Sequence, residues 1–166
     1  NREVPFEIRN RNNFSIKENL AKRAAKLIRN GDVVFLDASS TVSHIAEQLS
    51  AEQNLTVITN STLVAVKLKE KHIRCYLTGG ITVENSHALV GSIAEKTVSQ
   101  LYANICFFSA QGIDERGNVS DQSEEESTLR GLMIQNSQKQ YFLLTAVNTI
   151  NALRLKSARP GMLPVS

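Results

Sequence analysis

The chain has 166 residues, of which 42% are hydrophobic, and its formal net charge at pH 7 is +3. This length suits one domain with a sizeable core, and no run approaches the roughly 18–20 apolar residues that a membrane span needs. We expect Cys75 and Cys106, which lack C-x-x-C spacing, to be core residues of a protein without metal or cofactor. No secretory leader is recognised, so we expect a reducing, cytoplasmic setting.

The first thirty residues are basic, with eight Lys or Arg against three Asp or Glu. Residues 1–14 are polar and irregular and indicate a connector. Ser15 and Glu18 form a capping box that predicts a helix start, and Asn30-Gly31 predicts its end. We expect the basic side chains of this helix to form a solvated polar face without DNA contact, namely Lys17, Lys22, Arg23, Lys26 and Arg29.

Short apolar strands then alternate with segments of helical periodicity. The expected strands are 33–37, 55–58, 73–77, 105–108 and 141–144, and the expected helices are 41–50, 62–70, 91–101 and 123–137. Residues 81–90 indicate a short strand and a turn, and 111–118 a hairpin. Nearly continuous apolar strands that alternate with helices predict an α/β fold: an open, mostly parallel sheet with helices on both faces.

Polar or glycine-containing loops follow four of the expected strands. Because ligands bind beyond the carboxyl ends of parallel strands, these loops form our candidate site. Its residues are Asp37, Ser39, Ser40, Thr41, Thr59, Asn60, Gly79, Gly80, Gly112 and Asp114. The loop 37–41 joins a buried strand to a helix start, where backbone N–H groups favour an anion such as phosphate. Ser and Thr are also common N-caps that need no ligand, and both interpretations stay open.

The same loops carry a resemblance to a known family. In order, the motifs are Phe6–Arg9, the Lys17-to-Gly31 helix, Asp37–Thr41, Thr59-Asn60-Ser61, Gly79-Gly80, Gly91, Gly112-Ile113-Asp114 with Gly117, and Glu126–Ile134. Together they resemble the effector-sensing domain of DeoR-type bacterial transcriptional repressors. The resemblance implies the fold of ribose-5-phosphate isomerase, glucosamine-6-phosphate isomerase and CoA transferases.

It also implies a phosphorylated sugar effector, bound by the loop 37–41 and the other candidate loops, and a homo-oligomer. Operator DNA would be bound only through a winged helix-turn-helix domain ahead of this chain, and no membrane is involved. Residues 1–14 would then be the connector from that domain, 15–150 the effector-sensing domain, and 151–166 an atypical tail.

The chain departs from the family pattern after its last expected strand. Ala146 and Thr149 stand where the family carries an Asp and a pocket Lys. A sugar-phosphate isomerase of the same fold is the alternative; its acid or base would be Asp37, Asp114 or the Glu124–Glu126 cluster. The histidines form no metal-ligand pattern. A third possibility is an oligomerisation domain with a vestigial pocket.

Overall fold

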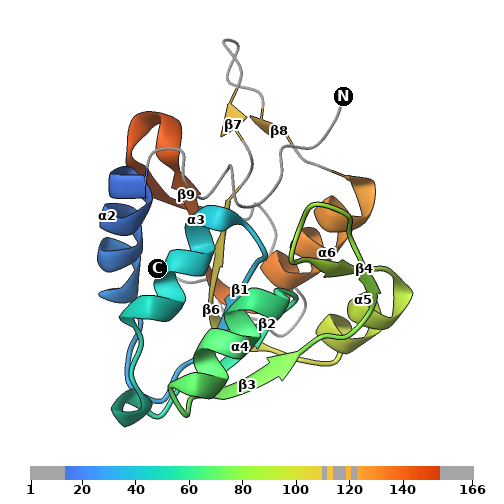
Figure 1. Cartoon of the computed structure of the whole chain (residues 1–166), viewed down its shortest axis with the longest axis horizontal. Helices are drawn as coiled ribbons and strands as arrows, with labels where there is room; N and C mark the ends of the chain where they lie inside the picture. The colour runs from blue at the N-terminus through green and yellow to red at the C-terminus, as the bar shows by residue number, and fades with distance from the viewer. Residues whose placement is uncertain (1–13, 110–111, 114–118, 121–122, 154–166) are drawn as a thin grey trace.

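A six-stranded sheet forms the centre of the computed structural model, which describes residues 14–109, 112–113, 119–120 and 123–153 (Figure 1). The strand order is β10-β9-β6-β1-β2-β3. Five strands run parallel and β10 pairs antiparallel with β9. Their bounds are β1 Val33–Leu36, β2 Thr56–Thr59, β3 Arg74–Leu77, β6 Ala103–Phe108, β9 Ser137–Leu144 and β10 Thr149–Ala152.

Helices cover both faces of this sheet, which confirms the predicted fold class. One face packs against α2 (Phe14–Ala25), α3 (Ser40–Ser43), the 3₁₀ helix η1 (His44–Gln48) and α4 (Thr62–Glu70). The other face packs against α5 (Ser92–Ser99) and α6 (Glu124–Gln135). None of the described helices is long and apolar enough to cross a bilayer.

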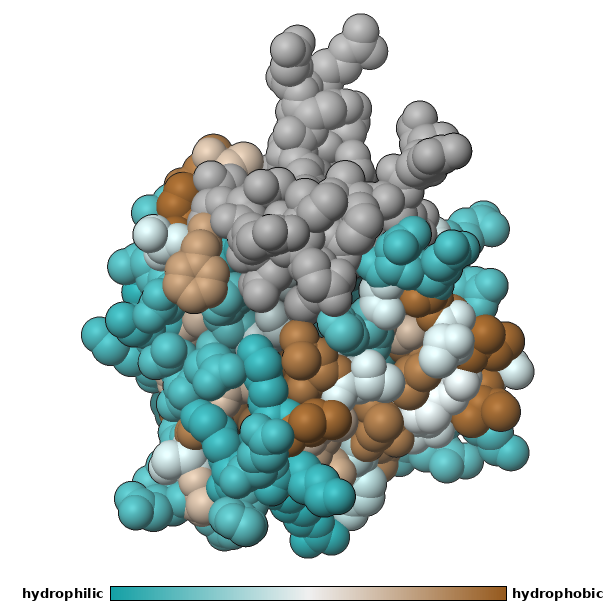
Figure 2. Space-filling view, viewed as in Figure 1, coloured by the Kyte–Doolittle hydropathy of each residue, from teal (hydrophilic) through white to brown (hydrophobic). Residues whose placement is uncertain are grey.

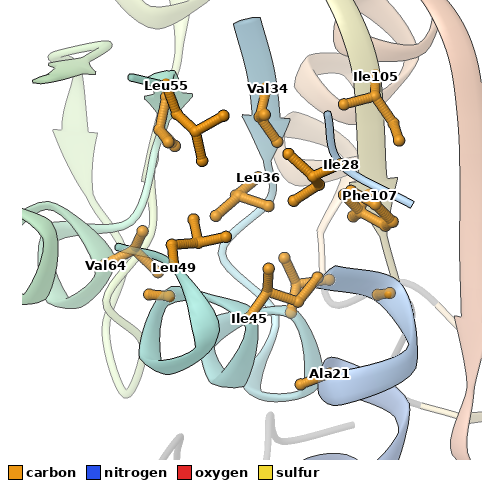
Figure 3. Packing of buried hydrophobic residues seen from close by; sticks show 14 of the residues in the cluster. Ala21, Ile28, Val34, Leu36, Ile45, Leu49, Leu55, Val64, Ile105 and Phe107 are labelled. Atoms are coloured by element: carbon orange, nitrogen blue, oxygen red, sulfur yellow. The ribbon is translucent and has the colours of Figure 1, made fainter. Parts of the chain in front are cut away.

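The alternation of side chains along each strand creates two cores. Val34 and Leu36 of β1 point toward Ala21 of α2 and Ile45 of η1 (Figure 3), whereas Phe35 belongs to the core beneath α5 and α6. Because both faces of β1 are buried, an unbroken apolar run is the expected sequence of this strand. Cys106 is likewise buried, and Cys75 packs at the margin of the first core.

Two short 3₁₀ helices and two two-stranded pairs lie outside the main sheet. They are the 3₁₀ helices η2 (Ala51–Gln53) and η3 (Thr145–Val147), the pair β4 (Ile81–Thr82) and β5 (Leu89–Val90), and the pair β7 (Gly112–Ile113) and β8 (Val119–Ser120). Both pairs are antiparallel. They agree with the strand and turn predicted in 81–90 and with the hairpin predicted around 111–118.

Several predicted boundaries were wrong. Helix α2 already includes Ser15, so this serine lies inside the helix rather than capping it. The helix ends at Ala25, because Leu27 and Ile28 donate three residues back, in tight turns. The single helix expected over 41–50 is a four-residue α-helix that continues as 3₁₀ helix.

The C-terminal part of the sheet is larger than predicted. Strand β9 begins at Ser137 because it pairs with β6 from Ala103 onward. Strand β10, which the sequence did not predict, pairs antiparallel with β9 and includes Thr149. It crosses the boundary between residues 150 and 151, where we expected an atypical tail to begin.

Candidate functional site

Polar residues from neighbouring strands lie side by side at the carboxyl edge of the sheet. The register pairs Leu36 with Thr59 and Thr59 with Leu77, so Asp37, Asn60 and Thr78 follow on three adjacent strands. Ser109 follows β6, the neighbour of β1 on the other side. These four residues are between 2% and 5% exposed. The loops after these four strands therefore begin at one edge of the sheet, and that they bind a ligand stays a prediction.

Asp37 connects three segments of this edge. Its Oδ1 accepts hydrogen bonds from the Ser39 backbone N–H (3.0 Å) and hydroxyl (2.7 Å). Its Oδ2 accepts from the Ser109 backbone N–H at 2.9 Å and lies 3.7 Å from Nε of Arg130 on α6. The carboxylate thus ties the loop after β1 to the end of β6 and to α6.

Two opposing effects of its environment act on the pKa of Asp37. Burial raises the pKa of this carboxyl above its ordinary value, because the ionised form loses hydration. The positive charge of Arg130 and the hydrogen bonds from Ser39 and Ser109 lower the pKa and oppose that effect. Its oxygens accept three hydrogen bonds, so Asp37 holds the loop after β1 in place.

Ser39 and Ser40 have different roles in the loop. Ser39 is the N-cap of α3, and its Oγ accepts from the Val42 backbone N–H at 3.2 Å. Ser40 is 6% exposed, and its Oγ accepts from Nζ of Lys17 at 2.9 Å. Within the described part of the chain, the backbone N–H groups of Ser40 and Thr41 have no acceptor. The loop therefore presents hydrogen-bond donors together with a lysine.

The expectation that Lys17 lies on a solvated polar face was wrong. Lys17 is 5% exposed, and it shares the buried side of α2 with Leu20, Ala21 and Ala24. The spacing 17, 20, 21, 24 is that of one helix face, so the sequence did carry the signal. Its helix position places this lysine at the loop after β1. The α-helix that follows the loop, α3, has only four residues, so the dipole of a long helix does not act on an anion there.

The polar side chains at the end of β2 are buried, and some of their hydrogen-bonding atoms have partners. Thr59 Oγ1 accepts from the Ser61 backbone N–H at 3.0 Å. Asn60 donates its Nδ2 to the Leu89 carbonyl at 3.0 Å, which identifies Oδ1 as the remaining acceptor. This Oδ1 is buried and has no hydrogen-bond partner among the described residues. At the edge of the sheet it is thus an acceptor with no donor in the described part of the chain.

The glycines after β3 have structural reasons to be glycine. Gly80 has a φ of +124°, and a Cβ there would lie 2.4 Å from the Val90 carbonyl oxygen. The close approach at Gly80 is therefore to the backbone of strand β5. Gly79 also has a positive φ, of +73°. A role of either glycine toward a ligand stays a prediction, as it does for Gly112 in β7, and Asp114 lies outside the described residues.

Other candidate groups do not form a catalytic or metal centre in the described residues. Glu124, Glu125 and Glu126 occupy the first turn of α6, whose N-cap is Ser123. His44 is 6% exposed and packs edge-on against Phe14, with 5.1 Å between ring centroids. Burial lowers the pKa of His44, and the charges of Lys67 and Lys17 add to this effect. No group of three metal-binding side chains is found among the described residues.

Arg130 is a site residue that sequence reasoning missed. It lies in α6 beside buried Leu129, and its side chain is 15% exposed. Nothing in the local pattern distinguishes it from an arginine on a solvated helix face. Its neighbour Asp37 is far away in sequence, so only the fold brings them together.

Comparison with known proteins identifies the family. The family model described as the DeoR C-terminal sensor domain matches residues 12–148. The chain belongs to the DeoR sensor-domain family. It is 34% identical over 149 residues to the HTH-type transcriptional regulator GolR of Listeria innocua, covering 88% of this chain and 59% of that protein. The HTH-type regulator YulB of Bacillus subtilis is 37% identical over 136 residues, covering 81% and 52%.

A third relative is the lactose phosphotransferase system repressor of Staphylococcus epidermidis, with 34% identity over 131 residues, 77% of this chain and 51% of that protein. The chain therefore spans between half and three fifths of the length of these regulators. All three are named as regulators or repressors, so this DeoR-type chain is grouped with regulatory proteins and not with enzymes.

Solved structures match the fold of this DeoR domain. Ribose 5-phosphate isomerase A from Methanocaldococcus jannaschii has a TM-score of 0.56 at 16% identity, covering 78% of this chain and 52% of that one. A D-ribose-5-phosphate isomerase in complex with phospho-erythronic acid also has a TM-score of 0.56, at 14% identity and coverages of 79% and 52%. At these identities the likeness shows a common fold.

Proposed function

We propose that this chain is the effector-sensing and self-associating part of a DeoR-type transcriptional regulator. A phosphorylated sugar or a related metabolite binds at the carboxyl edge of the sheet and modulates DNA binding by a separate winged helix-turn-helix domain. The names of relatives support a sugar-related role: one is a lactose phosphotransferase system repressor and another, from Haemophilus influenzae, an L-fucose operon activator.

The contact between Lys17 and Ser40 carries this proposal. A lysine is a common point-charge ligand for phosphate. Here Nζ reaches a loop whose backbone N–H groups, at Ser40 and Thr41, lack acceptors in the described chain. An anionic phosphoryl group placed there accepts from the two N–H groups and pairs with the ammonium group.

Asn60 extends the site toward the sugar. It follows the strand next to β1, and its Oδ1 is buried without a donor in the described chain. An unpaired buried acceptor costs about 1–3 kcal/mol. A hydroxyl group of the bound sugar removes this cost by donating to Oδ1. Phosphate recognition by Lys17 and hydroxyl recognition by Asn60 together select a phosphorylated polyol over either group alone.

Effector binding acts on DNA binding through linkage. An effector that binds one arrangement of the regulator more tightly shifts the population toward it, and DNA affinity changes by the same coupling. Asp37 suits this role because it joins the effector loop to β6 and α6. A shift of the loop therefore reaches both elements through one side chain.

Thermal unfolding with added ligands tests this proposal. Inorganic phosphate, ribose 5-phosphate and glucosamine 6-phosphate are compared with the unphosphorylated sugars. A ligand at about 100 times its Kd stabilises the native state by about 2.7 kcal/mol, a rise of roughly 5–11 °C in Tm for a chain of this length. Equal shifts with unphosphorylated sugars contradict the phosphate site. Turnover of either sugar phosphate instead supports the isomerase alternative.

Lysine variants on one helix provide the matched control. Lys17→Met removes a charged hydrogen-bond donor worth about 1.5–3 kcal/mol, so the Kd for the phosphorylated ligand rises by roughly 10- to 100-fold. Lys22→Met removes a lysine of the same helix whose side chain is 57% exposed and pairs with Glu18, and it leaves the Kd unchanged. Equal affinity in the Lys17 and Lys22 variants removes Lys17 from the site.

A further inference from the structure

Among the residues that the structure describes, one edge of the main sheet is unpaired and apolar. β3 pairs with β2 on one side and is the terminal strand of the sheet order. Edge strands of monomers are commonly protected by charged residues, proline or bulges, because their free N–H and C=O groups pair readily with another strand. In β3 the charged residue is Arg74, and its guanidinium lies 5.6 Å from the centre of the Tyr76 ring.

Exposed apolar side chains surround this edge. We call Tyr76, Leu77, Ile81 and Ile93 the β3-edge patch; they are 42%, 41%, 65% and 64% exposed. Ile93 lies against the turn that follows β3, since a Cβ at Gly79 would lie 3.6 Å from Ile93 Cγ2. Figure 2 shows hydrophobic side chains gathered over β4 and α5, the elements that carry these isoleucines.

The opposite edge of the sheet differs in chemistry. There the exposed residues of β10 are Asn151 and Ala152, one polar and one small. Within the strands themselves, β3 exposes Tyr76 and Leu77, whereas β10 exposes no large apolar side chain; Val147 and Leu153, on either side of β10, are 59% and 39% exposed. An exposed strand edge flanked by large apolar side chains is typical of an interaction surface.

The size of the patch matches what a dimer needs. With about 150–200 Å² for a fully exposed large apolar side chain, the four residues present roughly 300–400 Å². A standard interface buries about 800 Å² per partner, of which a little over half is apolar. The patch therefore supplies most of the apolar share of one side, and the strand backbone supplies hydrogen bonds.

We propose that a second copy of this chain pairs with the β3 edge, β3 against β3 and antiparallel about a two-fold axis. This inference locates the self-association that the proposed function includes. A two-fold axis brings the same patch from both copies together, which makes one surface self-complementary. It also satisfies the edge N–H and C=O groups of both strands and joins the two sheets into one.

The location couples the interface to the effector edge. The segment Thr78–Gly80 follows β3 directly and adjoins Asn60 at the carboxyl edge. The Thr78 carbonyl accepts a hydrogen bond at 2.9 Å from Thr97 of α5, the helix that carries Ile93. A ligand that moves this segment therefore changes both the pairing strand and the patch.

Sedimentation analysis of tyrosine variants tests the inference. We expect the chain to sediment as a dimer at about 10 µM. Tyr76→Glu places a like charge on both sides of the axis and raises the dimer Kd at least tenfold. Tyr102→Glu makes the same change at a tyrosine that is 49% exposed and lies outside the patch, and it leaves the Kd unchanged. Ile93→Glu repeats the test on α5, without altering β3 itself.

Hydrogen exchange separates strand pairing from side-chain contact alone. In the dimer the amides of β3 exchange slowly, and in the monomeric Ile93→Glu variant they exchange faster, while those of β10 do not change. A chain that stays monomeric up to about 100 µM overturns the inference. So does a dimer that persists in both patch variants, or β3 amides that exchange equally in dimer and monomer.

The titration of the wild-type chain with phosphorylated ligands is run on the same preparations. A dimer that binds no phosphorylated ligand refutes the effector site and leaves the β3 edge standing. A monomer that binds the phosphorylated ligand does the reverse, so the two proposals fail independently.

Discussion

Replacing Gly80 with alanine separates a structural glycine from a ligand-contacting one. A Cβ at this position would lie 2.4 Å from the Val90 carbonyl oxygen and 3.1 Å from the Ala94 Cβ. The backbone φ of +124° is also one that side chains rarely adopt. Because the Val90 oxygen belongs to the backbone of β5, it cannot move aside as a flexible side chain could.

The magnitude follows from these two costs. An unfavourable positive φ costs about 1–2 kcal/mol, and forcing an extra carbon into a packed contact typically costs 1–3 kcal/mol. We therefore expect Gly80→Ala to lower the free energy of unfolding by about 2–5 kcal/mol without any ligand. For a chain of this length that corresponds to a fall in Tm of roughly 4–20 °C.

The free energy of unfolding is measured by urea and thermal unfolding, followed by circular dichroism. Alanine variants of two other glycines serve as references. Gly31 has a φ of +85° with nothing within 4 Å of an added Cβ, so Gly31→Ala reports the backbone cost alone, about 1–2 kcal/mol. Gly131 lies within α6 with open space around it, and Gly131→Ala stabilises by about 0.5–1 kcal/mol. A Gly80→Ala chain as stable as Gly31→Ala refutes the steric reasoning, and weaker ligand binding with unchanged stability restores the ligand role.

Two further predictions concern buried ionisable groups. Asp37→Asn places an amide N–H₂ opposite the Ser109 N–H and Arg130, and we expect a loss of about 2–4 kcal/mol in urea unfolding near pH 7; a change under about 0.5 kcal/mol would argue against Asp37 as the connecting residue. The pKa of His44 is lowered from 6.5 in the folded chain, so the unfolded chain binds the proton more readily and stability falls as the pH drops below about 6.5. Urea midpoints of the wild type and His44→Gln between pH 7.5 and 5 check this, because the variant should lose less stability on acidification; parallel profiles would exclude His44 as the cause.

The fold was predictable from the sequence because its signals are local. Apolar runs such as Val33–Leu36 and polar loops after them define parallel strands without reference to distant residues. Strand β10 escaped prediction for the opposite reason. Thr149–Ala152 has no apolar run of its own, and it becomes a strand because β9 offers a free edge for antiparallel pairing.

The candidate site was predictable as a set of loops but not as a set of contacts. The order of strands in the sheet decides which loops are neighbours, and the register puts Asp37 beside Asn60. Arg130 belongs to the site only because the packing of α6 brings it to Asp37. Lys17 was misjudged because its charge suggested solvent, although its helix position matched that of the buried residues.

The two interpretations of the loop after β1 apply to different residues of it. Ser39 is an N-cap, a local role that any serine before a helix can take. Ser40 meets a lysine 23 residues earlier in the chain, which a cap does not require. A stability measurement alone would register both serines, because each loses a hydrogen bond on mutation. Only the response to a phosphorylated ligand separates the two roles. Removing the Ser39 cap destabilises the free and the ligand-bound protein equally. Removing Lys17, the partner of Ser40, destabilises the ligand-bound protein more than the free one.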